Sequence, residues 1–105
     1  MYQVRVDELV LKKDFKGIDL RNQIRIVKAI RQKLTTKPKE FGKPLRGELK
    51  RFWKLRVGEF RVIYEVKEEE VLVTIICVGF RRDEEVYRSL LSRLRSDEPP
   101  EHRCG

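Results

Sequence analysis

Three cations lie close together in the segment FWKLRVGEFRVIY, residues 52–64. If residues 58–59 form a two-residue hairpin loop, alternation places Lys54, Arg56 and Arg61 on one face of a sheet, with Arg56 directly opposite Arg61. Like charges in that position destabilise a sheet by up to roughly 1 kcal/mol a pair. The cluster therefore predicts a site for an anion, since bound phosphate would offset the repulsion.

The side chains available for chemistry are those of Lys, Arg and Tyr. The single histidine, His102, lies near the C-terminus, so the folded part has no His-based acid–base pair or His metal site. No acidic cluster has metal-ligand spacing, no Gly-rich loop precedes a helix, and no Ser or Cys has a partner base. We therefore expect neither a metal nor a cofactor.

Such a set of side chains suits phosphodiesters, and RNA above all. RNA carries its own nucleophile, the 2′-OH, so an enzyme must align it, balance charge on phosphorus and manage two proton transfers. Arg binds phosphate oxygens bidentately and stays protonated. Clustered cations also lower the pKa of a neighbouring Lys or Tyr, which then acts as a base. A metal ion is not required for this chemistry.

The two arginines also have an ordinary interpretation, as solvated surface residues. Glu59 or Glu65 could neutralise either Arg56 or Arg61. Alternation places no acid on the face they share with Lys54, however, and this favours the anion site.

Length and composition limit which class of protein this chain can be. The chain has 105 residues, 40% of them hydrophobic and 40% charged, enough for one domain with a modest core. We expect that domain over residues 1–95 and a flexible tail over residues 96–105. Twenty-five Lys and Arg against 17 Asp and Glu give a net charge of +8, which favours a polyanionic partner.

The sequence also indicates where the protein works. It contains no apolar stretch long enough to span a membrane and no signal peptide. Cys77 lies in an apolar run and Cys104 in the polar tail, so we expect both to be unpaired. These features predict a cytoplasmic protein without a membrane partner.

The first half of the chain reads as a strand and two helices. Residues 2–6 alternate like a strand, and residues 7–16 predict a short helix that Gly17 ends. Asp19 is an N-cap candidate for a longer helix. Its apolar residues recur at helical spacing: Leu20, Ile24, Val27, Ile30 and Leu34. Residues 35–44 read as a loop.

The second half is rich in strands, which we expect at 51–57, 60–67 and 71–80. A tight turn after the second of these would pair Arg61 with Ile76. The last strand is apolar at almost every position, which predicts that it is covered on both faces. A C-terminal helix follows, beginning near residue 83.

The element order is β-α-α-β-β-β-α. It predicts an α+β fold, in which two N-terminal helices and a C-terminal helix pack on a small, mostly antiparallel sheet. The first strand joins this sheet, but the sequence does not say beside which neighbour.

Three stretches then carry a resemblance: LRG from Leu45, WKLRVGEFRVIYEV from Trp53, and VLVTIICVGFRRDEEVY from Val71. They resemble the RelE/ParE superfamily of bacterial and archaeal toxins, with RelE the more similar branch. The resemblance covers residues 2 to about 94 and implies a RelE-like fold. It implies the toxin of a type II toxin–antitoxin pair, an endoribonuclease that cuts mRNA in the ribosomal A site after the second codon position.

The resemblance also assigns catalytic positions, which fall on Lys54, Arg56, Arg61, Arg81 and Tyr87. Lysine is common in the family where this chain has Arg56, and arginine is a poor general base. Lys54 or Tyr87 would therefore take the 2′-OH proton. Arg61 would hold the phosphate, and Arg81 would lie near the leaving 5′-oxygen.

The predicted register puts Arg81 on the wrong face, opposite that of Arg61. We therefore expect either a bulge at Gly79 or a turn after Phe80 to redirect it.

Further residues are candidates for binding RNA, each with an alternative role. Phe80 is either strand-end core or a stacking surface for a base. Apart from the resemblance, Tyr87 would be a helix anchor, and several arginines would be surface cations or turn residues. The full set of RNA- or rRNA-binding candidates is Phe80, Arg82, Arg46, Lys50, Arg51 and Arg88.

The partners that the resemblance implies are a RelB-like antitoxin covering the basic site, mRNA, and the 70S ribosome with its 30S A site and 16S rRNA. One alternative is a ParE-like inhibitor of DNA gyrase without nuclease activity. Another is a catalytically silent relative. Arg81 and Tyr87 argue against the first alternative, since ParE-type toxins typically lack that set, and competent residue types at all five catalytic positions argue against the second.

Overall fold

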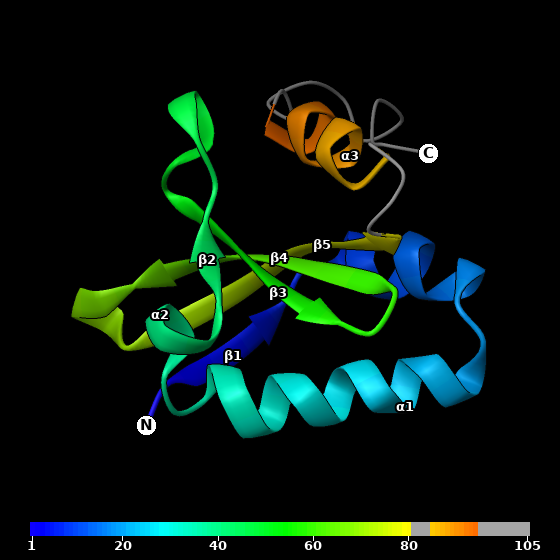
Figure 1. The fold of residues 1–105 in the computed structure, drawn as a ribbon, viewed down its shortest axis with the longest axis horizontal. Helices are drawn as coiled ribbons and strands as arrows, with labels where there is room; N and C mark the ends of the chain where they lie inside the picture. Colours follow the sequence, from blue (N-terminus) through cyan, green and yellow to red (C-terminus); the bar gives the residue numbers. More distant parts are fainter. Residues whose placement is uncertain (81–84, 95–105) are drawn as a thin grey trace.

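The computed structural model describes residues 1–80 and 85–94, with side chains described throughout except at 85–89. Its centre is a five-stranded sheet in the order β1-β5-β4-β3-β2. Helices α1 (Leu20–Ala29) and α3 (Glu85–Leu94) cover opposite faces of this sheet (Figure 1). The predicted α+β fold is confirmed. The strands are β1 (Gln3–Val6), β2 (Lys43–Pro44), β3 (Phe52–Val57), β4 (Phe60–Lys67) and β5 (Leu72–Phe80).

The first strand lies beside the last one. β1 pairs in parallel with β5, Val4 opposite Val73, whereas every other pairing in the sheet is antiparallel. Strand β5 is therefore interior to the sheet. Its residues enter the clusters on both faces, Val73 and Ile75 on the α1 side and Cys77 on the α3 side, as its apolar sequence predicted.

The helical half begins with irregular turns. The predicted helix over residues 7–16 is a π-helical turn, η1 (Val10–Asp14), followed by a 3₁₀ turn, η2 (Phe15–Gly17). Asp19 has the extended backbone of an N-cap, but its carboxylate accepts from the Asn22 side chain at 2.6 Å rather than from a backbone N–H. Helix α1 then continues into a second π-helical turn, η3 (Ile30–Leu34).

The long helix packs through a different stripe from the predicted one. Ile26, Ile30 and Leu34 are buried in the core beneath the sheet, whereas Leu20 is 70% exposed and Ile24 59% exposed. The prediction was right for two members of the apolar set and wrong for Leu20, Ile24 and Val27, which the sheet does not cover. The helix carries two apolar stripes, and the sheet buries the one that includes Ile26.

The segment predicted as a loop, 35–44, contains two short elements. Pro38 begins a single helical turn, α2 (Pro38–Phe41), and β2 follows on the edge of β3. Buried Tyr64 donates its hydroxyl to the Pro38 carbonyl at 2.6 Å and so ties α2 to the sheet. A side chain at Gly42 would overlap the Tyr64 hydroxyl, at 1.8 Å from its ideal Cβ, so this close approach requires glycine.

Candidate functional site

The predicted cationic row is present. Arg56 lies directly opposite Arg61, and Val57 opposite Phe60, across a hairpin whose Gly58 has φ +57°. That positive φ is the one glycine adopts at a tight hairpin turn. Lys54 shares the face of Arg56 by alternation, so the hairpin register derived from the sequence is confirmed.

A fourth cation joins this row that sequence reasoning missed. Lys43 on β2 lies directly opposite Lys54 on β3, so the two side chains are on the same face. The signal was weak, because a two-residue strand that itself contains Pro44 has no periodicity to detect. We call Lys43, Lys54, Arg56 and Arg61 the cationic row.

Exposure to solvent differs from residue to residue along the cationic row. Lys43 and Arg56 are exposed, while Lys54 and Arg61 are half-buried, and the Arg61 Nε is fully buried. A half-buried guanidinium has fewer orientations open to it than an exposed one, and its charge is less screened than in water. The row thus combines outer cations that meet solvent with inner cations whose positions are restricted.

One acid shares this face, contrary to the sequence argument. Glu65 lies opposite Phe52, on the side of Arg61 by alternation. It is four residues further along β4, about 13 Å from Arg61 at the usual rise of a strand. The prediction of a face without acids is therefore wrong for the full length of β4. The direct neighbour of Arg61 on β3 is nevertheless Arg56.

An apolar cluster supports the row from the same face. It is formed by Leu45, Phe52, Ile63, Cys77 and Leu90, with Leu49 and Ile76 packed against it. Leu90 comes from α3, so this helix is anchored on the face that carries the cations. Figure 1 shows the connection between β2 and β3 rising from the sheet on the side where α3 lies.

The register between β4 and β5 differs from the prediction. Arg61 pairs with Gly79, not with Ile76. The connection is longer than a tight turn, because a 3₁₀ turn, η5 (Glu68–Glu70), is followed by Val71 in the left-handed region at φ +51°. In addition, neighbouring β4 residues face Cys77 and Ile75, so Ile76 has no direct partner and forms the bulge.

The bulge expected at Gly79 is therefore absent, and β5 has an unpredicted bulge at Ile76 instead. With the observed register, Gly79 is on the face of Arg61, and the conflict that motivated a bulge at Gly79 does not arise. Strand β5 is described as far as Phe80. Arg81 and Arg82 lie outside the described residues.

The bulge frees backbone groups of β5 from the sheet, and the two side chains of a buried ion pair hydrogen-bond to them. Arg93 of α3, 5% exposed, makes a two-pronged contact with the Asp14 carboxylate at 2.8 and 3.1 Å and also donates to the Ile76 carbonyl. The Val78 N–H donates to the same carboxylate at 2.8 Å. This network, also missed by sequence reasoning, joins α3, η1 and β5.

The structure separates Phe80 from the cationic row. Phe80 lies opposite Phe60, its ring stacked on that ring at 4.6 Å between centroids, on the α1 side of the sheet. It is nonetheless 42% exposed, so it is partly a core residue and partly a surface aromatic. It is not brought together with Arg56 and Arg61.

The remaining RNA-binding candidates lie on two elements. Arg46, Lys50 and Arg51 are exposed on the connection between β2 and β3, and the Arg51 guanidinium lies 4.7 Å over the ring of Phe52. This contact links the connection to the apolar cluster beneath the row. Tyr87 and Arg88 belong to α3, but their side chains are outside the described part.

Comparison with known proteins decides the family. The profile of a family described as "ParE toxin of type II toxin-antitoxin system, parDE" matches residues 4–85. The chain belongs to this toxin family. It is the toxin of a type II toxin–antitoxin system and a member of the RelE/ParE superfamily, as the resemblance indicated.

Its relatives include RelE toxins. Toxin RelG of Mycobacterium tuberculosis (strain ATCC 25618 / H37Rv) is 38% identical over 55 residues, 52% of this chain and 61% of that protein. The match thus spans about three fifths of that relative's length.

Solved structures of RelE toxins match over most of the fold. The toxin–antitoxin complex RelBE2 from Mycobacterium tuberculosis matches at TM-score 0.71 and 30% identity, covering 76% of this chain and 98% of that one. The isolated RelE toxin of E. coli matches at TM-score 0.64 and 26% identity, covering 90% and 99%. A mutant of E. coli RelE in complex with an antitoxin RelBc peptide matches at 0.63 and 28%, covering 88% and 96%.

Within residues 1–80 and 85–94, no three side chains of His, Cys, Asp and Glu gather where they could hold a metal ion. In the same part of the chain, every helix is too short or too polar to cross a bilayer.

Proposed function

We propose that this toxin is a ribosome-dependent endoribonuclease that cleaves mRNA in the ribosomal A site and so inhibits translation. The observation that carries the proposal is the pair Arg56 and Arg61, directly opposite each other on two strands, with Lys54 beside them. Two arginines at directly opposite positions on one face can both present guanidinium groups to the non-bridging oxygens of a phosphodiester. Similarity to RelE toxins supports the same conclusion.

The proposed reaction uses the nucleophile of the substrate. The 2′-oxygen attacks the adjacent phosphorus, its proton passes to a base on the toxin, and the 5′-oxygen leaves with a proton from an acid. The products are a 2′,3′-cyclic phosphate and a 5′-hydroxyl end. Arginine charge balances the phosphorane, so the reaction proceeds without a metal ion.

Each residue then has a proposed role. Arg61, half-buried with its Nε enclosed, holds the phosphate in one position, and exposed Arg56 neutralises it from the solvent side. Lys54 or Tyr87 takes the 2′-OH proton, and Arg81 serves the leaving oxygen. The roles of Arg81 and Tyr87 rest on the resemblance alone.

We further propose an antitoxin as the natural partner. Two of the similar solved structures are toxin–antitoxin complexes, one with RelB and one with a RelBc peptide. A RelB-like antitoxin would cover the cationic row of this toxin. The remaining partners are mRNA and the 30S A site with its 16S rRNA, which place the action in the cytoplasm.

Toeprinting on programmed ribosomes tests the nuclease. We expect the purified toxin to cut the A-site codon of ribosome-bound mRNA and to leave free mRNA uncut. Arg61→Gln should lower the single-turnover rate about 100- to 1,000-fold, as loss of one transition-state donor does. Arg5→Gln, at an exposed strand arginine on β1, is the matched control and should cut normally.

Two results would overturn the assignment: undiminished cutting by Arg61→Gln, or free cutting of naked RNA. The double variant Arg81→Ala, Tyr87→Ala tests the positions that come from the resemblance. Its retention of full activity would remove those two residues from the mechanism.

A second function is favoured by one observation, the description of the matching family as ParE toxins. In that case the protein inhibits DNA gyrase and cuts nothing. A folded wild-type toxin that arrests growth, leaves the A-site codon intact and blocks supercoiling by purified gyrase would establish the second function in place of the first.

A further inference from the structure

Strand β2 places a lysine at the outer end of the cationic row. Lys43 pairs with Lys54, and two residues further along β3, on the same face, Arg56 pairs with Arg61. Two like-charged pairs therefore lie next to each other, offset by one strand and two residues. Like charges directly opposite each other destabilise a sheet. One such pair suits one bound anion, and two adjacent pairs suit two anions in a line.

The backbone on both sides of Lys43 is held against β3. An ideal Cβ at Gly42 would lie 2.9 Å from the Lys54 carbonyl oxygen, so the chain just before Lys43 approaches β3 closely. Just after it, the Leu45 N–H donates to the Phe52 carbonyl at 2.9 Å. These contacts fix where Lys43 lies on the face, whereas its side chain is exposed and long enough to follow a ligand.

The countercharge for this part of the row does not come from the described side chains. Within residues 1–80 and 90–94, neither Lys43 nor Lys54 forms an ion pair. Glu65 shares the face, but it is two strands and two residues from Lys43, about 12 Å at a strand spacing of about 4.8 Å and a rise of about 3.3 Å per residue. A bound anion would therefore meet two cations at this place.

A lysine on an edge strand also has an ordinary explanation. Such lysines discourage two sheets from pairing edge to edge. That role is served on either face and needs no cationic neighbour. Lys43 instead lies directly opposite Lys54 and diagonal to Arg56. Its place in line with the arginine pair favours a role in binding the substrate.

We propose that Lys43 binds the mRNA phosphate on the 5′ side of the ribose whose 2′-OH attacks, which joins the first and second nucleotides of the A-site codon. The inference rests on the proposed nuclease and adds a second phosphate subsite to it. The probe that defines this subsite is the phosphate itself, so its charge can be removed without changing the toxin.

The order of residues along the row selects the 5′ phosphate. Arg56 and Arg61 hold the scissile phosphate, and Lys54 lies between that pair and Lys43. With Lys54 facing the attacking 2′-OH, the ribose lies over Lys54, and the phosphate on its far side is the 5′ one. Diagonal neighbours such as Lys43 and Arg56 are about 7–8 Å apart, which is comparable to the separation of successive phosphates in an extended RNA strand.

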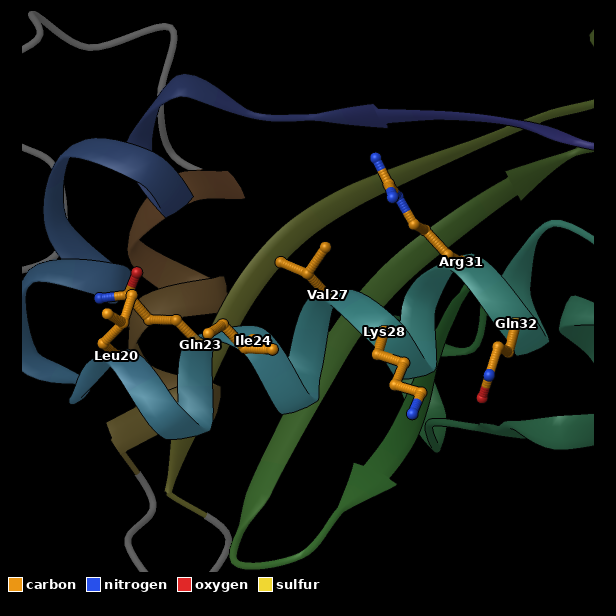
Figure 2. A pocket seen from close by; sticks show the side chains of 7 residues that line it. All are labelled: Leu20, Gln23, Ile24, Val27, Lys28, Arg31 and Gln32. Atoms are coloured by element: carbon orange, nitrogen blue, oxygen red, sulfur yellow. The ribbon is translucent and has the colours of Figure 1, made fainter.

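The cations of α1 cannot provide this second subsite. Lys28 and Arg31 line an open groove on that helix together with apolar side chains (Figure 2). Helix α1 covers the face of the sheet opposite to the cationic row (Figure 1). An RNA strand that crosses the row therefore meets Lys43 and not these residues, so Lys28, which is also exposed, is a matched control position.

The test is single-turnover cleavage of ribosome-bound mRNA by the whole toxin over a range of toxin concentrations. Loss of a binding contact raises the half-saturating concentration, whereas loss of a transition-state contact lowers the maximal rate. Lys43→Gln should raise the half-saturating concentration about tenfold and keep the maximal rate within about threefold of wild type. Lys43→Arg keeps the cation and should restore wild-type values. Lys28→Gln should stay within about threefold in both quantities.

A neutral linkage identifies the phosphate. One mRNA carries a methylphosphonate between the first and second nucleotides of the A-site codon, and its control carries a phosphate there. Both have 2′-deoxyribose at the first nucleotide, so that no 2′-OH attacks the neutral linkage, and both keep the scissile 2′-OH. Wild type should need about tenfold more toxin for half-maximal rate on the methylphosphonate mRNA. Lys43→Gln should lose almost nothing further, since the contact is already absent.

Four results would rule out this subsite. An unchanged half-saturating concentration for Lys43→Gln removes Lys43 from RNA binding, and weaker binding of the purified antitoxin by the same variant would assign Lys43 to that partner. An equal loss by Lys43→Gln on both mRNAs assigns the contact to rRNA. A loss that vanishes only when the methylphosphonate follows the third nucleotide places the contact on the 3′ side.

The fourth result separates this subsite from the nuclease. If the wild-type toxin leaves the A-site codon intact, the proposed nuclease fails and the subsite fails with it. If the wild-type toxin cuts and Lys43→Gln cuts with the same half-saturating concentration, the subsite fails alone.

Discussion

The buried ion pair between Asp14 and Arg93 is expected to hold the C-terminal helix in place. The two side chains are 10% and 4% exposed. The guanidinium also donates to the Ile76 carbonyl, and the carboxylate accepts from the Val78 N–H. We consider Asp14→Asn and Arg93→Met, which remove one charge each at little change in volume.

The expected loss of stability follows from this burial. Removing one partner of a buried pair leaves the other charge without its counter-ion, at a cost of about 3–5 kcal/mol. Native domains have a total free energy of unfolding of about 5–15 kcal/mol, so either variant loses a large share. For a domain of this size, 3 kcal/mol corresponds to a fall in Tm of about 12 °C or more.

Urea unfolding, followed by the fluorescence of the single tryptophan, Trp53, measures these losses. The double variant Asp14→Asn, Arg93→Met completes a cycle. It should lose less than the sum of the two single losses, since no charge is left unpaired. Lys12→Met breaks the exposed pair with Glu8, whose side chains are 64% and 80% exposed, and should change stability by no more than about 0.5 kcal/mol.

Because α3 also carries Tyr87, each single variant should cut ribosome-bound mRNA more slowly than wild type at a temperature where it is still folded. Single losses below about 1 kcal/mol, or a double variant that loses the full sum, would refute the reasoning. The ion pair would then be a surface-like contact without a structural role.

Burial raises the pKa of Tyr64 above its ordinary value of 10.0, so its contribution to stability should be full below pH 10 and be lost as pH rises further. Tyr64→Phe should lose about 1 kcal/mol at neutral pH by orphaning the Pro38 carbonyl and should flatten the alkaline unfolding curve. The bond from Lys39 lowers the pKa of Glu68 from 4.5, so the contribution of Glu68 is present above that pH and should be lost as pH falls below it, a dependence that Glu68→Gln removes in acid titration. Gly58→Ala should lose about 1 kcal/mol in urea unfolding, because alanine is strained at φ +57°; wild-type stability would contradict the assigned turn.

Local physics was enough to predict the hairpin and its charges. A Gly-Glu turn permits positive φ, and period-two alternation then places Arg56 opposite Arg61. The order of the longer elements and the buried character of β5 also followed from periodicity and composition, whereas α2 and β2 were missed. These features depend on residues close in the chain, which sequence patterns report directly.

The register of β5 against β4 could not be predicted from the sequence. A β-branched residue, Val71, adopts the left-handed conformation, which local preference disfavours. The bulge at Ile76 is stabilised by Arg93 and Asp14, residues 79 positions apart. Only this tertiary contact offsets the free-energy cost of the bulge. No sequence pattern near Ile76 could therefore reveal that the bulge forms there.

The choice of the buried face of α1 was also made by tertiary structure. The sequence has two apolar stripes, and periodicity alone could not tell that Ile26 faces the sheet while Ile24 faces solvent. The same holds for Lys43, which joins the cationic row only because β2 pairs with β3. The sequence determined which residues could bind phosphate and which could pack, and long-range packing decided which of them meet, because contacts between distant residues leave no local trace.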